Sequence, residues 1–339
     1  MQKRKKRYRL KKSVKISAAF FLIALVAIFS FLLLRNEAED TGPDYGKIHA
    51  MQSGEEERGD NYDMAAHDFI VKVFDVGQGS CMLIDYQDTE VLIDGGYYNE
   101  KNIHTLLKSK TGLSKYVTDG KIEYIIATHS DADHIGCLPE VIEAYKVGKI
   151  IYGDLLSENA SVDYLIAAAK EKNVPMVEDS DTVISLGKNA SLTIFDVCDG
   201  DAENINNNSI VTLIQYGETY FFASGDLPSE KEVLLRGKLP ECDVVIAGHH
   251  GSSSSNSLLS ELSPQYFIIS CGKAAKKGTK QANVYGFPHK EVLQAAEDGA
   301  ECFGTWKSGN IVLTSDGMTV SCSAKAKDEL TEEDAGAEK

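Results

Sequence analysis

The sequence predicts an α/β (α+β) sandwich in which two β-sheets pack face to face and helices cover their outer faces. Short apolar runs bounded by turn residues begin after residue 68, and this is the pattern of β-strands. Helical periodicity appears at 138–145, 162–172 and 290–298, each time close to an apolar strand. Two groups of strands with accompanying helices are typical of layered α/β domains. The polar residues that follow the strands are therefore expected along one edge of the sandwich.

The segment before the strands predicts one N-terminal transmembrane helix. Residues 1–15 carry nine Lys and Arg and no acid, and residues 16–34 contain no charged side chain. An apolar stretch of this length spans the hydrocarbon core of a bilayer. A cleaved signal peptide is the alternative, but residues 31–35 offer no small-residue cleavage site. The positive-inside rule then places residues 1–15 in the cytoplasm, as a basic segment, and the rest of this single-pass protein outside the cell membrane.

The rest of the chain divides into a linker, a domain and a tail. Residues 35–67 are acidic and polar with almost no apolar periodicity, which predicts a disordered linker. Residues 326–339 predict a disordered acidic tail for the same reason, and residues 68–325 form the folded domain. The net charge is -16, and without the nine basic residues at the N-terminus it is -25. This acidity excludes a nonspecific basic nucleic-acid binder, although bound metal ions reverse the potential locally.

The strands are expected as short apolar runs between turn signals. Two of them, 209–216 and 220–223, are joined by Gly217, Glu218 and Thr219, which predicts a hairpin. In order along the chain, strands are expected at 69–74, 81–86, 90–93, 124–127, 149–152, 183–184, 192–197, 209–216, 220–223, 244–247, 266–270 and 311–314.

The cysteines do not predict a disulfide framework. Seven of them are spread singly along the chain, and the number is odd. We expect most of them to be buried as small apolar side chains, with room for one bridge.

The run at 129–134 packs four potential metal ligands into six residues. These ligands are His129, Asp131, Asp133 and His134, and they follow the buried strand 124–127 directly, which places them on one loop. Imidazole nitrogen suits zinc, manganese or iron, and carboxylates favour manganese. An Asp-rich turn with incidental histidines is the alternative, but it does not account for this density. The run therefore predicts a centre for two divalent metal ions, zinc or manganese.

Three more segments supply polar groups at strand ends. Asp226 follows the strand 220–223, where an aspartate can bridge two ions, although an ordinary turn is also possible there. His249 and His250 follow the strand 244–247, and at least one of them is expected to be a ligand. Metal-binding histidines need partners that fix their orientation.

Asp75 and Asp94 are candidates for that orienting role. Each follows a strand and precedes glycines that permit tight turns beside the metal loop. We expect both to hydrogen-bond the ligand loop rather than the metal, and a plain turn is the alternative for each.

These motifs together resemble the metallo-β-lactamase superfamily and, more narrowly, the soluble hydrolase domain of ComEC-type competence proteins. The resemblance runs from about residue 69 to 320 and implies an αββα sandwich with the metals at one edge between the sheets. Most superfamily members carry a histidine at the position of Asp131. An aspartate there is similar to ComEC-like sequences, and this argues against β-lactamase activity. The motifs that carry the resemblance are DVGQGS at 75–80, LIDGG at 92–96, THSDADHIG at 128–136, SGD at 224–226 and HHGS at 249–252.

The same resemblance implies which residues contact a substrate. Asn206 and Ser209 match an Asn-x-x-Ser element that offers no strong third ligand to the first metal. The segment 283–289 is similar to a family segment that usually reads Asn-x-Tyr-Gly-His-Pro, from which Phe287 departs. A basic loop formed by Lys273, Lys276, Lys277 and Lys280 can hold a phosphodiester, or it is simply a solvated loop. The substrate-binding residues expected are Asn206, Ser209, Ser252, Lys273, Asn283, Tyr285 and His289.

The expected chemistry is phosphodiester hydrolysis by a water that two ions share. His129 and Asp131 would hold one ion, and Asp133, His134 and either His249 or His250 the other. Asp226 would lie between the ions, and it would be catalytic together with Asp133.

Three functions stay open from the sequence. The first is a membrane-tethered extracytoplasmic nuclease that acts on DNA. The second is a phosphodiesterase for phosphocholine or a similar head group of the cell surface. The third is a metal-containing binding or sensing module without turnover. A single hydrophobic span is present, so DNA uptake through a channel is not implied, and the oligomeric state is left open.

Overall fold

The computed structural model describes most of the chain after residue 68. The predicted basic segment, transmembrane anchor and linker at 1–15, 16–34 and 35–67 lie outside the described residues. None of the helices within the described part is both long and apolar enough to cross a membrane. The described residues are 69–153, 159–178, 181–197, 204–273, 285–297 and 299–336.

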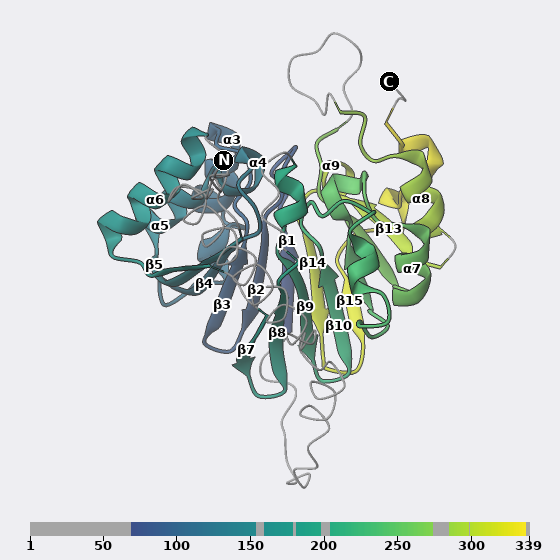
Figure 1. Cartoon of the computed structure of the whole chain (residues 1–339), viewed down its shortest axis with the longest axis horizontal. Helices are drawn as coiled ribbons and strands as arrows, with labels where there is room; N and C mark the ends of the chain where they lie inside the picture. The colour runs from purple at the N-terminus through teal and green to yellow at the C-terminus, as the bar shows by residue number, and fades with distance from the viewer. Residues whose placement is uncertain are drawn as a thin grey trace, which may run out of the picture. The chain divides into compact units, whose positions relative to one another are not determined.

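The described residues form two β-sheets, as the strand pattern predicts (Figure 1). Their strands are given in spatial order, from one edge of each sheet to the other. The first sheet contains β15 (Val320–Cys322), β14 (Ile311–Ser315), β1 (Phe69–Val73), β2 (Met82–Tyr86), β3 (Thr89–Ile93), β4 (Lys121–Ala127), β5 (Lys146–Tyr152) and β6 (Met176–Glu178). The second sheet contains β13 (Glu301–Gly304), β12 (Tyr266–Ile269), β11 (Val244–Ile246), β10 (Thr219–Ala223), β9 (Val211–Tyr216), β8 (Ala190–Phe195) and β7 (Thr182–Gly187).

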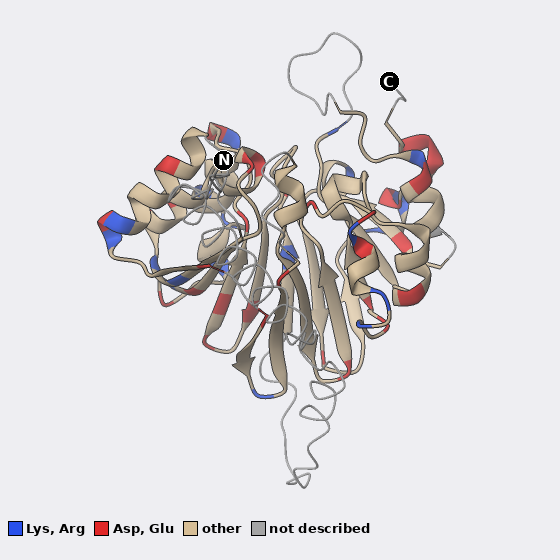
Figure 2. Ribbon diagram, in the orientation of Figure 1, with Lys and Arg blue, Asp and Glu red and all other residues tan. Residues whose placement is uncertain are grey.

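Helices lie on the outside of the two sheets, α5 and α6 on the side of the first and α7 and α8 on the side of the second (Figure 1). Charged side chains gather on these helices and at the turns, whereas most of the strand surface is uncharged (Figure 2). The α-helices are α3 (Glu100–Ile103), α4 (Ala132–Ile135), α5 (Leu138–Ala144), α6 (Ala160–Lys172), α7 (Asn256–Leu262), α8 (Lys290–Glu297) and α9 (Thr305–Ser308).

The main core lies between the two sheets. Four of its aromatic rings join the sheets, because Phe69 and Tyr86 of the first sheet pack against Tyr216 and Phe221 of the second. The rings of Phe69 and Tyr216 stack with centroids 5.0 Å apart. A second apolar cluster fills the space between the outer face of the first sheet and helices α5 and α6. Burial of this kind is the main force that holds the layers together.

The connection between β9 and β10 confirms the predicted hairpin. The two strands pair in antiparallel register, from Thr219 opposite Tyr216 to Ala223 opposite Thr212. Gly217 has a φ of 58°, a left-handed value that a hairpin turn requires and that glycine adopts at little cost.

The domain extends beyond residue 325, the boundary expected from the composition. Residues 326–336 contain two 3-10 turns, Ala326–Asp328 and Glu332–Asp334, instead of forming the expected disordered tail. Leu330 is 2% exposed and donates its N–H to the carbonyl oxygen of Cys302 at 2.7 Å. The side chain of Leu330 thus packs this acidic stretch against the domain beside β13. One buried apolar residue forms no periodic pattern, so nothing in the sequence indicates this packing.

The described cysteines form no disulfide with one another, as expected of small apolar side chains. Cys322 is partly exposed, Cys198 lies outside the described residues, and the other described cysteines are buried, namely Cys81, Cys137, Cys242, Cys271 and Cys302. Burial raises the pKa of Cys137 to about 12, so this thiol stays protonated at neutral pH.

The strand directions bring several polar segments to one edge of the sandwich. β3 and β4 are parallel neighbours in the first sheet, and β10, β11 and β12 are parallel neighbours in the second. Residues that follow these strands therefore leave the sheets at the same end, where ligands collect in α/β folds.

Candidate metal centre

The ligand loop begins directly after β4 and continues into a helix. His129 is fully buried, and Asp131 occupies the N-cap position of α4 without capping the helix through its side chain. Its carboxylate lies instead 3.6 Å from Nε2 of His129. Asp133 and His134 belong to the first turn of α4, so the expectation of a single loop was wrong for them. An aspartate before an amphipathic stretch is a helix start signal, and here it also serves the site.

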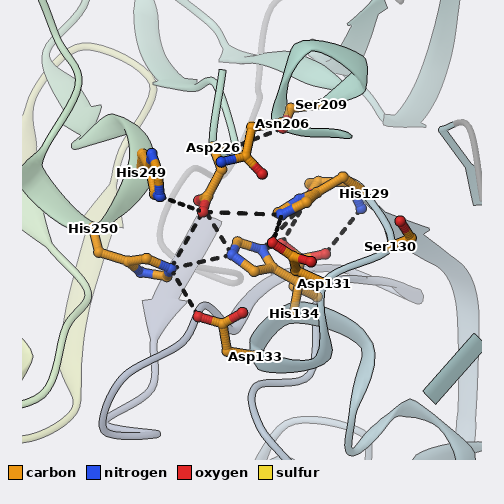
Figure 3. A network of polar contacts seen from close by, with 12 residues as sticks. His129, Ser130, Asp131, Asp133, His134, Asn206, Ser209, Asp226, His249 and His250 are labelled. Carbon is orange, nitrogen blue, oxygen red and sulfur yellow. Dashed lines mark hydrogen bonds and ion pairs between the residues drawn. The ribbon is translucent and has the colours of Figure 1, made fainter. Parts of the chain in front are cut away.

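The other candidate ligands arrive from the second sheet (Figure 3). Asp226 follows β10, and its Oδ1 lies 3.1 Å from Nε2 of His134. His250 follows β11, and its Nε2 lies 3.2 Å from Nε2 of His134 and 3.3 Å from Oδ2 of Asp133. His134 and His250, 116 positions apart in the sequence, thus converge within contact distance.

His249 takes a different place from His250. Its Nε2 lies 3.5 Å from Oδ2 of Asp226, and its side chain is 30% exposed, whereas that of His250 is 3% exposed. Both residues have left-handed backbone, with φ of 46° and 56°. Such strain in non-glycine residues is concentrated at functional sites. The structure therefore joins His250, rather than His249, to Asp133 and His134.

Two sets of side chains in the described residues could each hold an ion. Within each set the potential ligand atoms lie within 4.8 Å of one another, and His134 belongs to both. One set is His129, His134 and Asp226, and the other is Asp133, His134 and His250.

Hydrogen bonds outside the centre fix which nitrogen of each histidine faces it. Nδ1 of His250 lies 2.8 Å from the carbonyl oxygen of Ser270, which can only accept, so this nitrogen carries the proton. Nδ1 of His134 donates to Oδ2 of Asp94 at 2.7 Å. The Nε2 atoms of His134 and His250 consequently present lone pairs to each other in the neutral state.

The same reasoning applies to His129. The hydroxyl of Thr128 donates to Asp94 at 2.8 Å, so it can only accept from Nδ1 of His129 at 3.1 Å. Nε2 of His129 then carries a lone pair, and in the described part of the chain this buried atom has no hydrogen-bond partner. The centre is therefore lined by imidazole lone pairs and carboxylate oxygens, all of them acceptors. A cation is the species that satisfies such a set, and the residues present fit divalent metal ions.

The electrostatics of the centre agree with this composition. Burial alone would lower the pKa of His134, but the carboxylates of Asp226 and Asp94 raise it well above its usual value. Burial would raise the pKa of Asp226, but His134 and His250 hold it well below its ordinary range. Burial also opposes ionisation of Asp133, yet its bond to His250 brings its pKa down to about 2. The carboxylates of the centre thus favour positive charge at this place. Without a metal ion, protonated histidine carries that charge.

Asp94 lies at the centre of the supporting contacts. It follows β3 with a φ of 58°, accepts a hydrogen bond from the backbone N–H of Thr128 at 2.9 Å, and holds Nδ1 of His134. Histidine ligands in metal sites usually have such a carboxylate behind them.

Asp75 does not reach the ligands, contrary to its predicted role. Its carboxylate accepts from the N–H of Gly77 at 3.2 Å and pairs with Lys101 at 3.3 Å. The contact with the ligand loop comes instead from the backbone of the same turn, because the N–H of Ser80 donates to the carbonyl oxygen of Asp133. A Cβ on Gly79 would lie 2.5 Å from that oxygen, so only glycine fits there. The aspartate shapes the turn, and the glycine contacts the site.

The predicted substrate residues lie in several places. The hydroxyl of Ser209 accepts from the N–H of Asp226 at 3.1 Å, and the amide oxygen of Asn206 is buried. Ser252 donates to the carbonyl oxygen of His249 and lines a cleft of about 460 Å³ together with His289. Lys273 is exposed.

The segment around residue 287 is only partly described. Tyr285 stacks on Phe287, whose ring in turn lies over His250 with an interplanar angle of 22°. Asn283, Lys276, Lys277 and Lys280 lie outside the described residues.

Sequence reasoning missed two contributors to the centre and gave a third no role there. Thr128 stands within the motif, between the strand and His129, and this position was the available signal. The carbonyl oxygen of Ser270 orients His250, and nothing in the local sequence marks it. Phe287, noted only as a departure from the family segment, places its ring over that of His250.

Comparison with known proteins identifies two related chains. The first is ComE operon protein 3 of Bacillus subtilis, which is 28% identical over 240 residues, covering 66% of this chain and 30% of the relative. The second is Recombination protein 2 of Haemophilus influenzae, which is 26% identical over 232 residues, covering 66% of this chain and 26% of the relative. The chain thus matches less than a third of the length of either protein, and both matches confirm the resemblance carried by the motifs.

The known structures include similar chains. The metallo-β-lactamase fold protein YhfI from Bacillus subtilis aligns with 73% of this chain and 100% of its own, at 14% identity and a TM-score of 0.48. The family model of the metallo-β-lactamase superfamily matches residues 74–255, a span that begins at the end of β1 and includes every candidate ligand described above. Since this match covers more than half of the sequence, the chain belongs to the metallo-β-lactamase superfamily.

Proposed function

We propose that this chain is a metal-dependent phosphodiesterase that hydrolyses nucleic acid. The observation that carries the proposal is the buried centre in which the Nε2 lone pairs of three histidines converge with carboxylates, and in which Nε2 of His129 has no hydrogen-bond partner among the described residues. Two sets of ligands that share His134 suit a pair of ions set side by side. Such pairs serve displacement reactions at phosphorus.

The roles of the residues follow from their positions. His129 and Asp131 would hold one ion, Asp133 and His250 the other, with Asp226 reaching the histidines of both sets. When bound, the ions supply an acidified water and offset the charge on the leaving oxygen.

The chain's own residues provide orientation around that chemistry. Oδ2 of Asp133 lies 3.3 Å from Nε2 of His250, on the side of the second ion, and its other oxygen is poised to orient the attacking water. Asp94 and the carbonyl oxygen of Ser270 keep the Nε2 atoms of His134 and His250 free of protons. The cleft that Ser252 and His289 line begins beside the histidine turn and offers hydroxyl groups to a substrate.

Nucleic acid is the preferred substrate class because of the relatives. One of them bears a name that refers to recombination, a process of DNA, and the other is named for the ComE operon. We also propose that the basic segment 1–15 and the apolar segment 16–34 anchor the domain outside the cell membrane, because their charge pattern predicts it.

Hydrolysis assays with the full-length chain test the proposal. With added zinc or manganese, we expect cleavage of bis(p-nitrophenyl) phosphate and of linear DNA, and a loss of roughly a hundredfold or more in Asp133→Ala. Cleavage of a chromogenic phosphocholine ester with no action on DNA would favour a head-group phosphodiesterase. Equal and negligible rates of hydrolysis by the wild type and by Asp133→Ala would favour a binding or sensing module without turnover.

A further inference from the structure

We infer that the amide oxygen of Asn206 is a ligand of the first metal position, completing the set that His129, Asp131 and Asp226 begin. This inference rests on the proposed function, because it assumes that ions occupy the centre. It assigns to Asn206 a metal ligand's role in place of the substrate contact that the sequence suggests.

The first observation is a pair of buried acceptors without donors. Oδ1 of Asn206 is buried and has no hydrogen-bond partner among the described residues, and the same is true of Nε2 of His129. Buried acceptors in folded proteins are satisfied in the great majority of cases. One cation placed between them would satisfy both.

The second observation is the way the turn holds Asn206. It lies in the 3-10 turn Ile205–Asn208, where its N–H donates to the side chain of Asn204 at 3.3 Å and its carbonyl oxygen accepts from the N–H of Ser209 at 3.1 Å. The hydroxyl of Ser209 then accepts from the N–H of Asp226. The backbone of the turn is thus tied to the strand end that carries Asp226, and the side chain of Asn206 is left for the centre.

The third observation is the direction of that side chain. Figure 3 shows Asn206 beside Asp226, with its amide oxygen on the side that faces His129. The carboxylate of Asp131 lies 3.6 Å from Nε2 of His129 on the other side of this space, and that of Asp226 lies 3.9 Å away. The imidazole of His129 and oxygens of Asn206, Asp131 and Asp226 therefore surround the first position, beside the shared His134.

The Asn206 oxygen would belong to the first position alone. Each position has one imidazole of its own, His129 in the first and His250 in the second, and His134 belongs to both ligand sets. Loss of the Asn206 oxygen is therefore expected to release one ion and leave the other bound.

Isosteric variants separate a ligand from the alternatives. Asn206→Leu keeps the shape of the side chain but has no oxygen, and Asn206→Asp keeps an oxygen but has no N–H. If the amide were flipped and its N–H donated to His129 or Asp226, no amide oxygen would bind the ion. The aspartate variant, which lacks that donor, would then lose metal binding as the leucine variant does. Asn206→Ala provides a second oxygen-free variant if the leucine variant does not fold, as judged by its circular dichroism.

The readout is metal content after equilibrium dialysis of the full-length protein against zinc or manganese alone, together with calorimetric titration. We expect two equivalents in the wild type and in Asn206→Asp, and one equivalent, or at least a tenfold weaker first site, in Asn206→Leu and Asn206→Ala. His250→Ala, in which the second position is damaged, is the matched control and is expected to lose the other ion.

Three results would overturn the inference. Oxygen-free variants that bind two ions as tightly as the wild type would exclude Asn206 as a ligand, and so would an aspartate variant that loses an ion. A wild type that binds only one ion would also overturn it. If the wild type binds no ion at all, the proposed function itself is wrong. The wild type alone shows that outcome, without the Asn206 variants.

Discussion

Single hydrogen bonds behind the ligands decide the character of the centre. Each of the three buried histidines uses Nδ1 for a contact outside the centre, to Thr128, Asp94 or Ser270, and so presents Nε2 as a lone pair. The imidazoles would otherwise be free to exchange tautomers and point a proton at the metal position. The supporting residues therefore determine whether the ligands can bind.

Replacement of Asp94 by asparagine tests this control. The amide of Asp94→Asn can donate to Nδ1 of His134, which moves the imidazole proton to Nε2, where the ion would bind. We expect metal affinity to fall roughly 10- to 100-fold, as measured by calorimetric titration. Asp75→Asn is the control, because Asp75 contacts Gly77 and Lys101 and no candidate ligand, and it should bind metal as the wild type does. Unchanged affinity in Asp94→Asn would show that Asp94 does not set the tautomer.

Residues of the centre were predictable where their signal is local. The spacing from His129 to His134 and the doublet His249 and His250 are visible because they are dense clusters of ligand types after apolar strands. The choice of His250 over His249 was not predictable, since it depends on left-handed backbone at both positions and on the carbonyl oxygen of Ser270.

At the scale of elements, strands with a continuous apolar run were predictable from the sequence. Short strands that form only by pairing with a neighbouring strand were not. β4 ends in the apolar run 124–127 and β10 in the apolar run 220–223, and these ends position His129 and Asp226. β6, β13 and β15 are three or four residues long and lie at sheet edges, where pairing with a neighbour rather than sequence pattern creates the strand. Such strands carry little periodic signal.

The pairing of β3 with β4 contains a buried acid that makes stability depend on pH. Glu90 in β3 is 5% exposed and lies beside Glu123 in β4, whose carboxylate accepts the N–H of Glu90 at 3.0 Å. Burial, followed by the hydrogen bond and the charge of Glu123, raises the pKa of Glu90 from 4.5 to about 8. The folded chain therefore keeps a proton that the unfolded chain releases between these two values.

This difference gives a prediction for Glu90→Gln. Below pH 4.5 both states hold the proton of Glu90, and as the pH rises towards about 8 the free energy of unfolding of the wild type falls. Glutamine keeps a donor for Glu123 and cannot ionise. We expect a melting temperature a few degrees above the wild type near pH 9 and a much smaller difference near pH 5. The exposed Glu171→Gln should show no such trend, and a constant difference for Glu90→Gln at all pH values would contradict the shift.

At the scale of the molecule, the centre exists only because two sheets meet at one edge. The first sheet supplies the run from His129 to His134, and the second supplies Asp226 and His250. The layered fold was predictable from strand and helix order, and the convergence of the strand ends follows from their parallel pairing. The packed segment 326–336 was not predictable, because Leu330 is its only buried apolar residue.

Because ligands from both sheets converge, a bound ion would act as a link between them and stabilise the whole domain. An ion present at a hundredfold excess over its dissociation constant adds about 2.7 kcal/mol to the free energy of unfolding. For a domain of this size that corresponds to a rise of roughly 5 to 11 °C in the melting temperature. We expect this rise when zinc or manganese is added to chelator-treated protein in a scanning calorimeter. His250→Ala should show a smaller rise, because it is expected to bind one of the two ions and lose the other. A wild type whose melting temperature does not respond to either ion would mean that no cation joins the two sheets at this edge.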